Sequence, residues 1–357
     1  MTRDRPDHCP PIPWEDLPRA HGDPPARARW RVAPEDFAVD EVLGFDPLGT
    51  GQHVLLQLRK RGANTVWVAG QLARLAGVPP VAVGYSGLKD RDAVTTQWFS
   101  VDLAGRPEPD WGQVAPGTVE VLAAQRHDRK LRRGSHRANR FVLVLRDLTG
   151  ARAAVEERLG VLRDRGFPNY FGEQRFGRDG SNPARALAML GGRLRVRDRA
   201  ERGLYLSAAR SVLFNRVLAA RVGGGTWDRP LAGEVLMLDG RHSRFLAEEP
   251  TPELMERAAR GEVHPTGPLW GRGEPEPREG ARQFEEEALA GCGDWCRGLE
   301  EAGLEADRRA LRARAHDLAW RWRGEDALEL AFTLASGAYA TALLREVAAP
   351  GQAFRST

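Results

Sequence analysis

The chain has 357 residues, of which 41% are hydrophobic and 29% charged, and its formal net charge is +4. This length predicts two domains with a substantial core, and this composition excludes a disordered chain. No run of about 18 apolar residues occurs, which excludes a membrane-spanning helix. Residues 1–23 contain no apolar stretch of the secretory type and the chain has three cysteines, so we expect a cytoplasmic protein without a disulfide scaffold.

Arginine carries almost all of the positive charge, because only Lys60, Lys89 and Lys130 among the 53 basic residues are lysine. Guanidinium groups bind phosphate through paired hydrogen bonds and stack on bases, which favours a nucleic-acid partner. Codon bias in a GC-rich genome also explains the count. The positions of the basic residues are therefore more informative than their number.

The first half of the chain reads as strands with few helices. Residues 1–27 are rich in proline and poor in apolar residues, and we expect a loosely held arm there. Asn64 and Thr65 are N-cap residues for a helix that continues to residue 75. Alternating or continuous apolar residues predict strands at 37–41, 53–58, 83–90, 94–101, 118–122 and 141–145.

Helices predominate in the second half. The pattern predicts them at 151–162, 182–190 and 206–222, where three consecutive glycines end the last one. A strand at 327–334 and a closing helix at 339–347 then restore the character of the first half. The short spacing between the strands favours an α+β fold with a mixed or antiparallel sheet.

The densest polar stretch is residues 84–98, where a strand ends in a glycine-bearing turn that contains Asp90 between Lys89 and Arg91. Neighbouring positive charge keeps a carboxylate ionised, and an ionised Asp serves as a nucleophile or a base. An Asp that only caps its own turn gives the same pattern. Asp90 and Asp92 together also suggest a magnesium site, which the basic surroundings disfavour.

A second stretch, residues 166–177, places Asn169, Phe171 and other aromatic residues between glycines, with Arg175 close behind. Aromatic rings with an arginine suit base stacking, although a buried core loop gives the same composition. Residues 127–140, six of them Arg or Lys, and the arginine-rich segment 193–202 are candidate phosphate tracks or solvated loops. Cys292 and Cys296 lack the partners that a zinc site needs.

These residues resemble the TruD family of tRNA pseudouridine synthases, and the matching motifs follow one another in order from about residue 30 to residue 347. They are Glu35-Asp36-Phe37-x-Val39-x-Glu41, Lys60-Arg61 with Asn64-Thr65, Gly87-Leu88-Lys89-Asp90-Arg91 continuing to Trp98, Asn139-Arg140-Phe141, Pro168-Asn169-Tyr170-Phe171-Gly172, Gln174-Arg175-Phe176-Gly177, Leu206–Ser211 with Phe214-Asn215, His264–Gly271, and Gly337–Thr341 with Leu344-Arg345-Glu346. Each motif alone is weak evidence, but their order makes the resemblance specific.

The resemblance implies an α+β pseudouridine synthase catalytic domain with a mixed or antiparallel sheet and an inserted, family-specific α+β domain. We place the flexible proline-rich arm at residues 1–27, the catalytic domain at 28–194 plus 316–357, and the insertion at 195–315, where the composition changes.

The resemblance also implies the chemistry: a uridine of tRNA, at position 13 in the D-arm, becomes pseudouridine without a cofactor or metal. Asp90 matches the catalytic aspartate. Phe37, Lys89, Asn169 and Phe171 match substrate-binding positions, with Phe171 stacking on the base and Asn169 as its polar companion. We infer that Lys89 holds Asp90 or a phosphate.

Two residues depart from the family pattern, because Asp92 stands where histidine is common and Ser86 where alanine is common. Neither departure removes a group that the chemistry needs. We expect a cytoplasmic monomer that acts on tRNA. The alternatives are a non-catalytic RNA-binding protein of the same fold and a metal-dependent RNA nuclease that uses Asp90 and Asp92.

Overall fold

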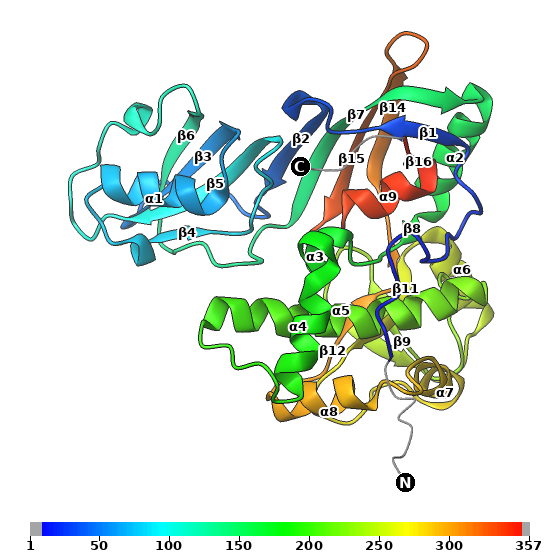
Figure 1. The fold of residues 1–357 in the computed structure, drawn as a ribbon. Helices are drawn as coiled ribbons and strands as arrows, with labels where there is room; N and C mark the ends of the chain where they lie inside the picture. The colour runs from blue at the N-terminus through cyan, green and yellow to red at the C-terminus, as the bar shows by residue number, and fades with distance from the viewer. Residues whose placement is uncertain (1–8, 352–357) are drawn as a thin grey trace. The chain divides into compact units, whose positions relative to one another are not determined.

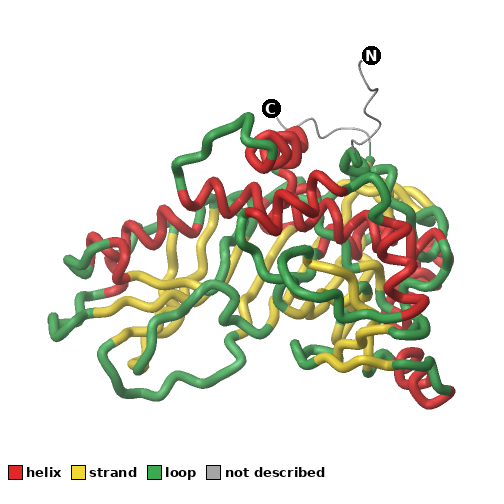
Figure 2. Tube along the Cα trace, turned by 90° about the horizontal axis from the view of Figure 1, so that it is seen from below, coloured by secondary structure: helices red, strands yellow, loops and turns green. Residues whose placement is uncertain are grey.

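The structure is a computed structural model that describes residues 9–351, except the side chain of Arg178. Its contacts divide the chain into two compact units. The sheet unit comprises residues 25–152, 315–337 and 348–351, and the helical unit comprises residues 9–24, 153–314 and 338–347. Both units contain helices and strands, which Figure 2 colours red and yellow.

A ten-stranded mixed sheet forms the sheet unit (Figure 1). Seven strands follow the order β14-β15-β7-β2-β5-β3-β6, β4 pairs with β5, and β1 pairs with both β7 and β16. The β2–β5 and β1–β16 pairs are parallel. The strands are β1 (Ala26–Arg29), β2 (Phe37–Val42), β3 (His53–Arg61), β4 (Val83–Tyr85), β5 (Val94–Asp102), β6 (Val119–His127), β7 (Ala138–Gly150), β14 (His316–Trp322), β15 (Leu328–Ala335) and β16 (Ala348–Pro350).

Helix α1 (Thr65–Leu75) covers the part of this sheet made by β3, β4 and β5. The side chain of Asn64 accepts a hydrogen bond from the backbone N–H of Trp67 at 2.8 Å, so it caps the helix as its residue type predicts. Val68 and Leu72 on the helix pack against Leu56 and other buried residues of the sheet. The burial of these side chains holds β3 and β5 in place beneath the segment that follows β4.

The expected strands and the α+β class are confirmed, with one difference that matters for function. The strand expected at 83–90 ends at Tyr85, and residues 86–93 form an irregular segment before β5 begins at Val94. Gly87 and the charged residues after it give this stretch the composition of a turn. The candidate carboxylate Asp90 therefore lies in a loop that two strands hold at both ends.

The helical unit has a four-stranded sheet, in the order β10-β9-β11-β12, and a two-stranded pair of β8 and β13. Its helices are α2 (Arg152–Arg165, which begins at the last residue of the sheet unit), α3 (Glu173–Phe176), α4 (Ser181–Leu190), α5 (Arg199–Gly223), α6 (Pro252–Arg260), α7 (Glu279–Ala288), α8 (Gly293–Glu301) and α9 (Ala340–Val347). Its strands are β8 (Phe167–Pro168), β9 (Glu234–Leu238), β10 (Arg244–Ala247), β11 (Val263–Leu269), β12 (Asp307–Ala310) and β13 (Arg312–Ala313).

Helix α5 is the central element of the helical unit. Asp198 caps it by accepting a hydrogen bond from the backbone N–H of Glu201 at 2.7 Å. Leu213, Phe214 and Leu218 are fully buried along it, so its apolar residues organise two of the hydrophobic clusters of the unit. Within residues 9–351, none of the helices combines the length and the hydropathy needed to span a bilayer.

The described part of the proline-rich arm, residues 9–27, is packed rather than loose, and its last two residues belong to β1. Leu17 is 2% exposed, and the buried Arg345 donates hydrogen bonds to the carbonyl oxygens of Leu17 at 2.6 Å and Trp14 at 3.2 Å. The remaining residues of the expected arm, 1–8, lie outside the described residues. The expectation overlooked the aromatic and leucine side chains, which supply enough apolar surface to hold the segment.

The expectation of no disulfide scaffold, based on the three cysteines, did not anticipate a single disulfide. Cys9 and Cys292 form a disulfide with a Cα–Cα distance of 4.9 Å, and Cys296 is a free thiol one helical turn away. Both bonded cysteines are buried. Two cysteines 283 residues apart give no local signal, so the sequence offered no way to pair them.

The compact units change after residues 24, 152, 314, 337 and 347, whereas the sequence predicted an inserted domain at 195–315. Residues 338–347, predicted to lie in the catalytic domain, pack with the helical unit. The upstream boundaries differ because α2, β8 and α4 precede the change in composition but pack with the helical unit. Asn169 and Phe171 consequently belong to the helical unit, while Phe37, Lys89 and Asp90 belong to the sheet unit.

Candidate active site

Asp90 is held in the loop between β4 and β5 by a cation from a distant part of the sequence. The guanidinium Nη2 of Arg31 donates to the Asp90 carboxylate Oδ2 at 2.8 Å. The Asp90 side chain is 23% exposed, so the carboxylate is oriented and still reaches solvent. The charge partner expected from the sequence was a neighbouring cation, but the structure supplies Arg31, 59 residues earlier.

The Arg31 guanidinium contacts an aromatic ring as well as the Asp90 carboxylate. Its guanidinium carbon lies 4.0 Å from the centre of the Phe37 ring, and Phe37 meets Phe141 edge to face with a centroid distance of 6.2 Å. The backbone of Arg31 has a φ of 59°, a left-handed conformation that costs free energy in a residue with a Cβ. Phe37 therefore sits close to Asp90, but its ring faces the arginine that holds the carboxylate.

A buried lysine supports the backbone of Asp90. The Lys60 ammonium donates to the carbonyl oxygen of Asp90 at 2.9 Å and to that of Ala63 at 2.7 Å. Lys60 is 1% exposed, and burial lowers its pKa to about 8. These two hydrogen bonds fix the backbone of the loop, independently of the contact between Arg31 and the Asp90 carboxylate.

Lys89, expected to hold Asp90 or a phosphate, instead forms an ion pair with Glu41 at 2.8 Å. The side chains are 8% and 0% exposed, so this pair is almost fully buried. The other Glu41 oxygen accepts from the backbone N–H of Trp98 at 3.2 Å. The backbone N–H of Lys89 donates to the Thr65 hydroxyl at 2.9 Å. Lys89 thus anchors the loop to β2 and to the start of α1, and its ion-pair partner here is Glu41 rather than Asp90.

The arginine-rich segment 127–140 lies beside the Asp90 loop. The backbone N–H of Gly134 donates to the Ser86 carbonyl at 2.7 Å, and the hydroxyls of Ser86 and Ser135 are 3.1 Å apart. Exposed basic side chains in this segment are Arg129, Arg132, Arg133, Arg137 and Arg140. A cluster of exposed guanidinium groups next to a held carboxylate suits a polyanionic substrate.

Asp92 is exposed, two residues beyond Asp90. Among residues 9–351, no group of three or more His, Cys, Asp or Glu side chains lies close enough together to hold a metal ion. A divalent cation prefers several oxygen ligands in one place.

In the helical unit, Asn169 and Phe171 follow β8. The Asn169 amide donates to the Ala310 carbonyl at 2.8 Å, and its oxygen accepts from Arg309 at 2.5 Å. The backbone N–H of Phe171 donates to the side-chain oxygen of Asn215 at 2.9 Å. The backbone of β12 and the amide of Asn215 therefore fix both residues, which are each 7% exposed.

The Phe171 ring is surrounded by two rings and two cations. Arg309 lies 4.2 Å from its centre and Arg175 lies 5.5 Å from it, while Phe214 and Tyr339 meet it edge to face at 5.3 and 6.0 Å. The burial of Arg309 lowers its pKa to about 10. The sequence indicated an aromatic and cationic cluster here, and the structure places the Arg309 guanidinium over the Phe171 ring.

The sequence prediction missed several residues of these clusters. Arg31 lies outside every motif that pointed to the site, and Arg309 is one of many arginines. Tyr339 and Glu41 belonged to matching motifs but received no role. Their roles follow from spatial contacts that join distant segments, which spacing along the chain does not show.

Comparison with known proteins agrees with this architecture. A family model described as "tRNA pseudouridine synthase D (TruD)" matches residues 19–192 and 192–347. The tRNA pseudouridine synthase D of Methylococcus capsulatus is 50% identical over 334 residues, 94% of each chain. The protein of the same name from Nitrosococcus oceani is 51% identical over 329 residues, 91% of this chain and 92% of the relative.

A solved structure from Methanosarcina mazei, assigned to tRNA pseudouridine synthase D, superposes with a TM-score of 0.68. It is 18% identical and the match covers 92% of this chain and 95% of that one, so the likeness extends to the whole fold. These matches define the class as pseudouridine synthases. The chain belongs to the tRNA pseudouridine synthase D family.

Proposed function

We propose that this chain isomerises uridine to pseudouridine in tRNA, with uridine 13 of the D-arm as its target and Asp90 as its catalytic carboxylate. One observation supports the assignment to Asp90 above the others. Its side chain reaches solvent, is held by Arg31 at 2.8 Å, and stands in a loop that Lys60 and Lys89 anchor. A preorganised carboxylate of this kind suits chemistry at a sugar carbon.

The reaction breaks the bond between N1 of uracil and C1′ of ribose, turns the base, and forms a bond between C5 and C1′. The proton released from C5 balances the proton gained at N1, so the product is an isomer of the substrate. No atom is oxidised and no bond is hydrolysed, so the proposal includes no cofactor and no metal. The Asp90 carboxylate acts either by attacking C1′ or by removing the proton of C2′.

The other site residues take supporting roles in this proposal. Phe37 fixes Arg31, and Lys89 fixes the loop through Glu41, so both act on the substrate through Asp90. Asn169 and Phe171 give the helical unit polar and aromatic surroundings for an RNA base. Extrusion of a uridine from its stack costs a few kcal/mol, which such surroundings offset.

A tRNA substrate places this reaction in the cytoplasm, and we expect the chain to act there as a monomer. A neutral residue at position 90 would favour the non-catalytic RNA-binding alternative, and the carboxylate that the chain has there, held by a cation, argues against it. The nuclease alternative requires magnesium and cleaves the RNA, which separates it experimentally from isomerisation.

The test is pseudouridine mapping on unmodified tRNA with EDTA present, using wild-type protein and Asp90→Asn. The asparagine keeps the shape of the side chain and an oxygen that Arg31 contacts, but it removes the charge. We expect pseudouridine at position 13 with the wild type, and a rate at least about 1,000-fold lower with Asp90→Asn.

Two outcomes contradict the proposal in different ways. Equal rates for the two proteins exclude Asp90 as the catalytic carboxylate, and pseudouridine at another position excludes uridine 13. Tight tRNA binding without any isomerisation by the wild type supports the binding-protein alternative. Cleaved RNA that depends on added magnesium supports the nuclease.

A further inference from the structure

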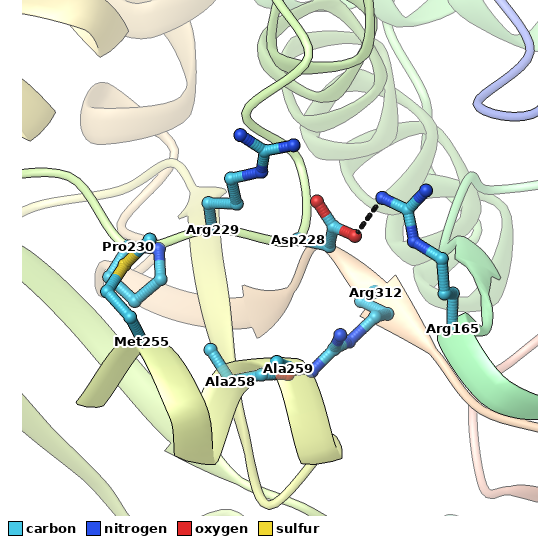
Figure 3. Close-up of a pocket in the computed structure, with 8 residues that line it drawn as sticks. All are labelled: Arg165, Asp228, Arg229, Pro230, Met255, Ala258, Ala259 and Arg312. Atoms are coloured by element: carbon cyan, nitrogen blue, oxygen red, sulfur yellow. Dashed lines mark hydrogen bonds and ion pairs between the residues drawn. The ribbon is translucent and has the colours of Figure 1, made fainter. Parts of the chain in front are cut away.

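The helical unit contains a pocket of about 430 Å³ whose lining combines positive charge with small apolar side chains (Figure 3). The end of α2, the loop after α5, helix α6 and strand β13 contribute to it. The lining residues are Arg165, Asp228, Arg229, Pro230, Met255, Ala258, Ala259 and Arg312. None of these residues has a role in the reaction proposed above.

Arg312 is a buried cation that a hydrogen-bond network holds in one orientation. It is 3% exposed, and its Nε donates to Nδ1 of His264 at 2.9 Å. Its Nη2 donates to the carbonyl oxygens of Ala258 at 2.6 Å and Val263 at 3.0 Å. Because Nδ1 of His264 accepts, its Nε2 carries the proton and donates to Asp239 at 2.8 Å. Burial lowers the pKa of His264, which favours this neutral form.

The remaining nitrogen of Arg312, Nη1, has no hydrogen-bond partner among residues 9–351, and no carboxylate there forms an ion pair with this side chain. A buried charge without a bonded counter-charge is costly, and the cost falls when an anion binds beside it. Burial also lowers the pKa of Arg312 to about 10, in keeping with a cation that lacks a bonded carboxylate.

The rest of the lining leaves the pocket positive. Arg165 donates to the carboxylate of Asp228 at 2.7 Å, so these two charges neutralise each other (Figure 3). Arg229 is exposed, and within residues 9–351 its side chain makes no hydrogen bond or ion pair. Three guanidinium groups and one carboxylate give a net charge of about +2 in a pocket large enough for a sugar and a phosphate.

We propose that this pocket binds one phosphate of the RNA backbone, which Arg312 and Arg229 hold while Pro230, Met255 and Ala259 contact the adjoining ribose. Guanidinium groups match phosphate oxygens in charge and in hydrogen-bond geometry. The inference rests on the proposed function, because it takes tRNA as the substrate. It adds a site in the helical unit that anchors the RNA without taking part in the chemistry.

The test is the dissociation constant for unmodified tRNA, measured at several salt concentrations with Arg229→Glu. Its control is Arg241→Glu, which makes the same charge change at an exposed arginine of the same unit, in the turn between β9 and β10 and outside the pocket. We expect Arg229→Glu to weaken binding about 10-fold at 0.1 M salt and to reduce the salt slope by about 1. Equal effects of the two variants would overturn the proposal.

A second variant blocks the pocket without changing its charge. Ala259 is exposed on α6, so Ala259→Trp preserves the helix and fills the cavity. We expect weaker tRNA binding, with a raised KM and a kcat within about twofold of the wild type. Unchanged binding by Ala259→Trp, with an unchanged thermal midpoint, would show that the pocket does not hold RNA.

Two further measurements distinguish free phosphate from the phosphate of RNA, and a failure of the pocket assignment from a failure of the proposed function. In the first measurement, inorganic phosphate is titrated into the protein in a calorimeter. If phosphate binds with a sub-millimolar dissociation constant, and Arg229→Glu abolishes this binding but leaves tRNA binding unchanged, the pocket binds free phosphate and the RNA assignment is overturned. The binding measurements do not require catalysis. If the wild type forms no pseudouridine but tRNA binding still depends on Arg229 and Ala259, the proposed function fails and the pocket assignment stands.

Discussion

The Asp90 loop of the sheet unit and the Phe171 segment of the helical unit use arginine in opposite ways. In the first, Arg31 orients a carboxylate that reaches solvent. In the second, Arg309 and Arg175 lie over an aromatic ring and donate to amide and hydroxyl oxygens. The sheet unit therefore presents a held negative charge, whereas the helical unit presents positive charge over an aromatic surface. This difference suggests a division between chemistry at the sugar and binding of the base or its phosphate.

The contact between Arg31 and Asp90 provides the sharpest test of this comparison. We expect Arg31→Ala to lower kcat about 100-fold, because the carboxylate loses both its orientation and its counter-charge. Arg31→Lys restores part of the rate, since an ammonium supplies the charge without the planar contact to Phe37. Rates are measured by single-turnover pseudouridine formation on unmodified tRNA.

The matched control for Arg31 is Arg61→Ala. Arg61 forms an ion pair with Glu35 at the same distance of 2.8 Å in the same unit, but both side chains are more than half exposed. An exposed pair contributes about 0–1 kcal/mol, so the control has the rate of the wild type. If Arg31→Ala also keeps the wild-type rate, Arg31 does not position the carboxylate.

The second prediction concerns Phe171 and Arg309, which we expect to act as one element in RNA binding. Phe171→Leu and Arg309→Met each remove one half of the stacked contact, so each raises the KM for tRNA about 10-fold with little change in kcat. The KM of the double variant is no higher than that of either single variant, because each single substitution already removes the contact. Steady-state kinetics of the four proteins test this expectation, and additive effects on KM would show that the residues act separately.

Thermal unfolding of the same four proteins separates binding from packing. Phe171 is 7% exposed, so its truncation also removes buried apolar contacts. A lower unfolding temperature with an unchanged KM would mean that Phe171 is a core residue, which is the buried-loop alternative that the composition of residues 166–177 left open.

The sequence predicted the α+β class, most strands and the two segments around Asp90 and Phe171, because these depend on local apolar patterns and on contiguous motifs. It did not predict that Arg31 holds Asp90 or that Arg309 covers Phe171, since those contacts join segments 59 and 138 residues apart. It assigned Lys89 to Asp90 or a phosphate, whereas the side chain pairs with Glu41, because residues adjacent in a turn point in different directions. Charge density singled out both segments, but only the fold selects the pairs.

The smallest expected effect concerns Lys60, the buried cation beneath Asp90. Burial lowers its pKa from 10.5 to about 8, so between these values the unfolded chain binds a proton that the folded chain has lost. The free energy of unfolding contributed by Lys60 therefore rises with pH in this window, by about 1 kcal/mol between pH 8 and pH 9. In Lys60→Met, which leaves the carbonyl oxygens of Asp90 and Ala63 without this donor, the rise is absent. Denaturant unfolding of both proteins at the two pH values measures the difference, which cancels titrations common to both. A constant difference would show that Lys60 keeps an ordinary pKa and is not held as a desolvated amine beneath the carboxylate.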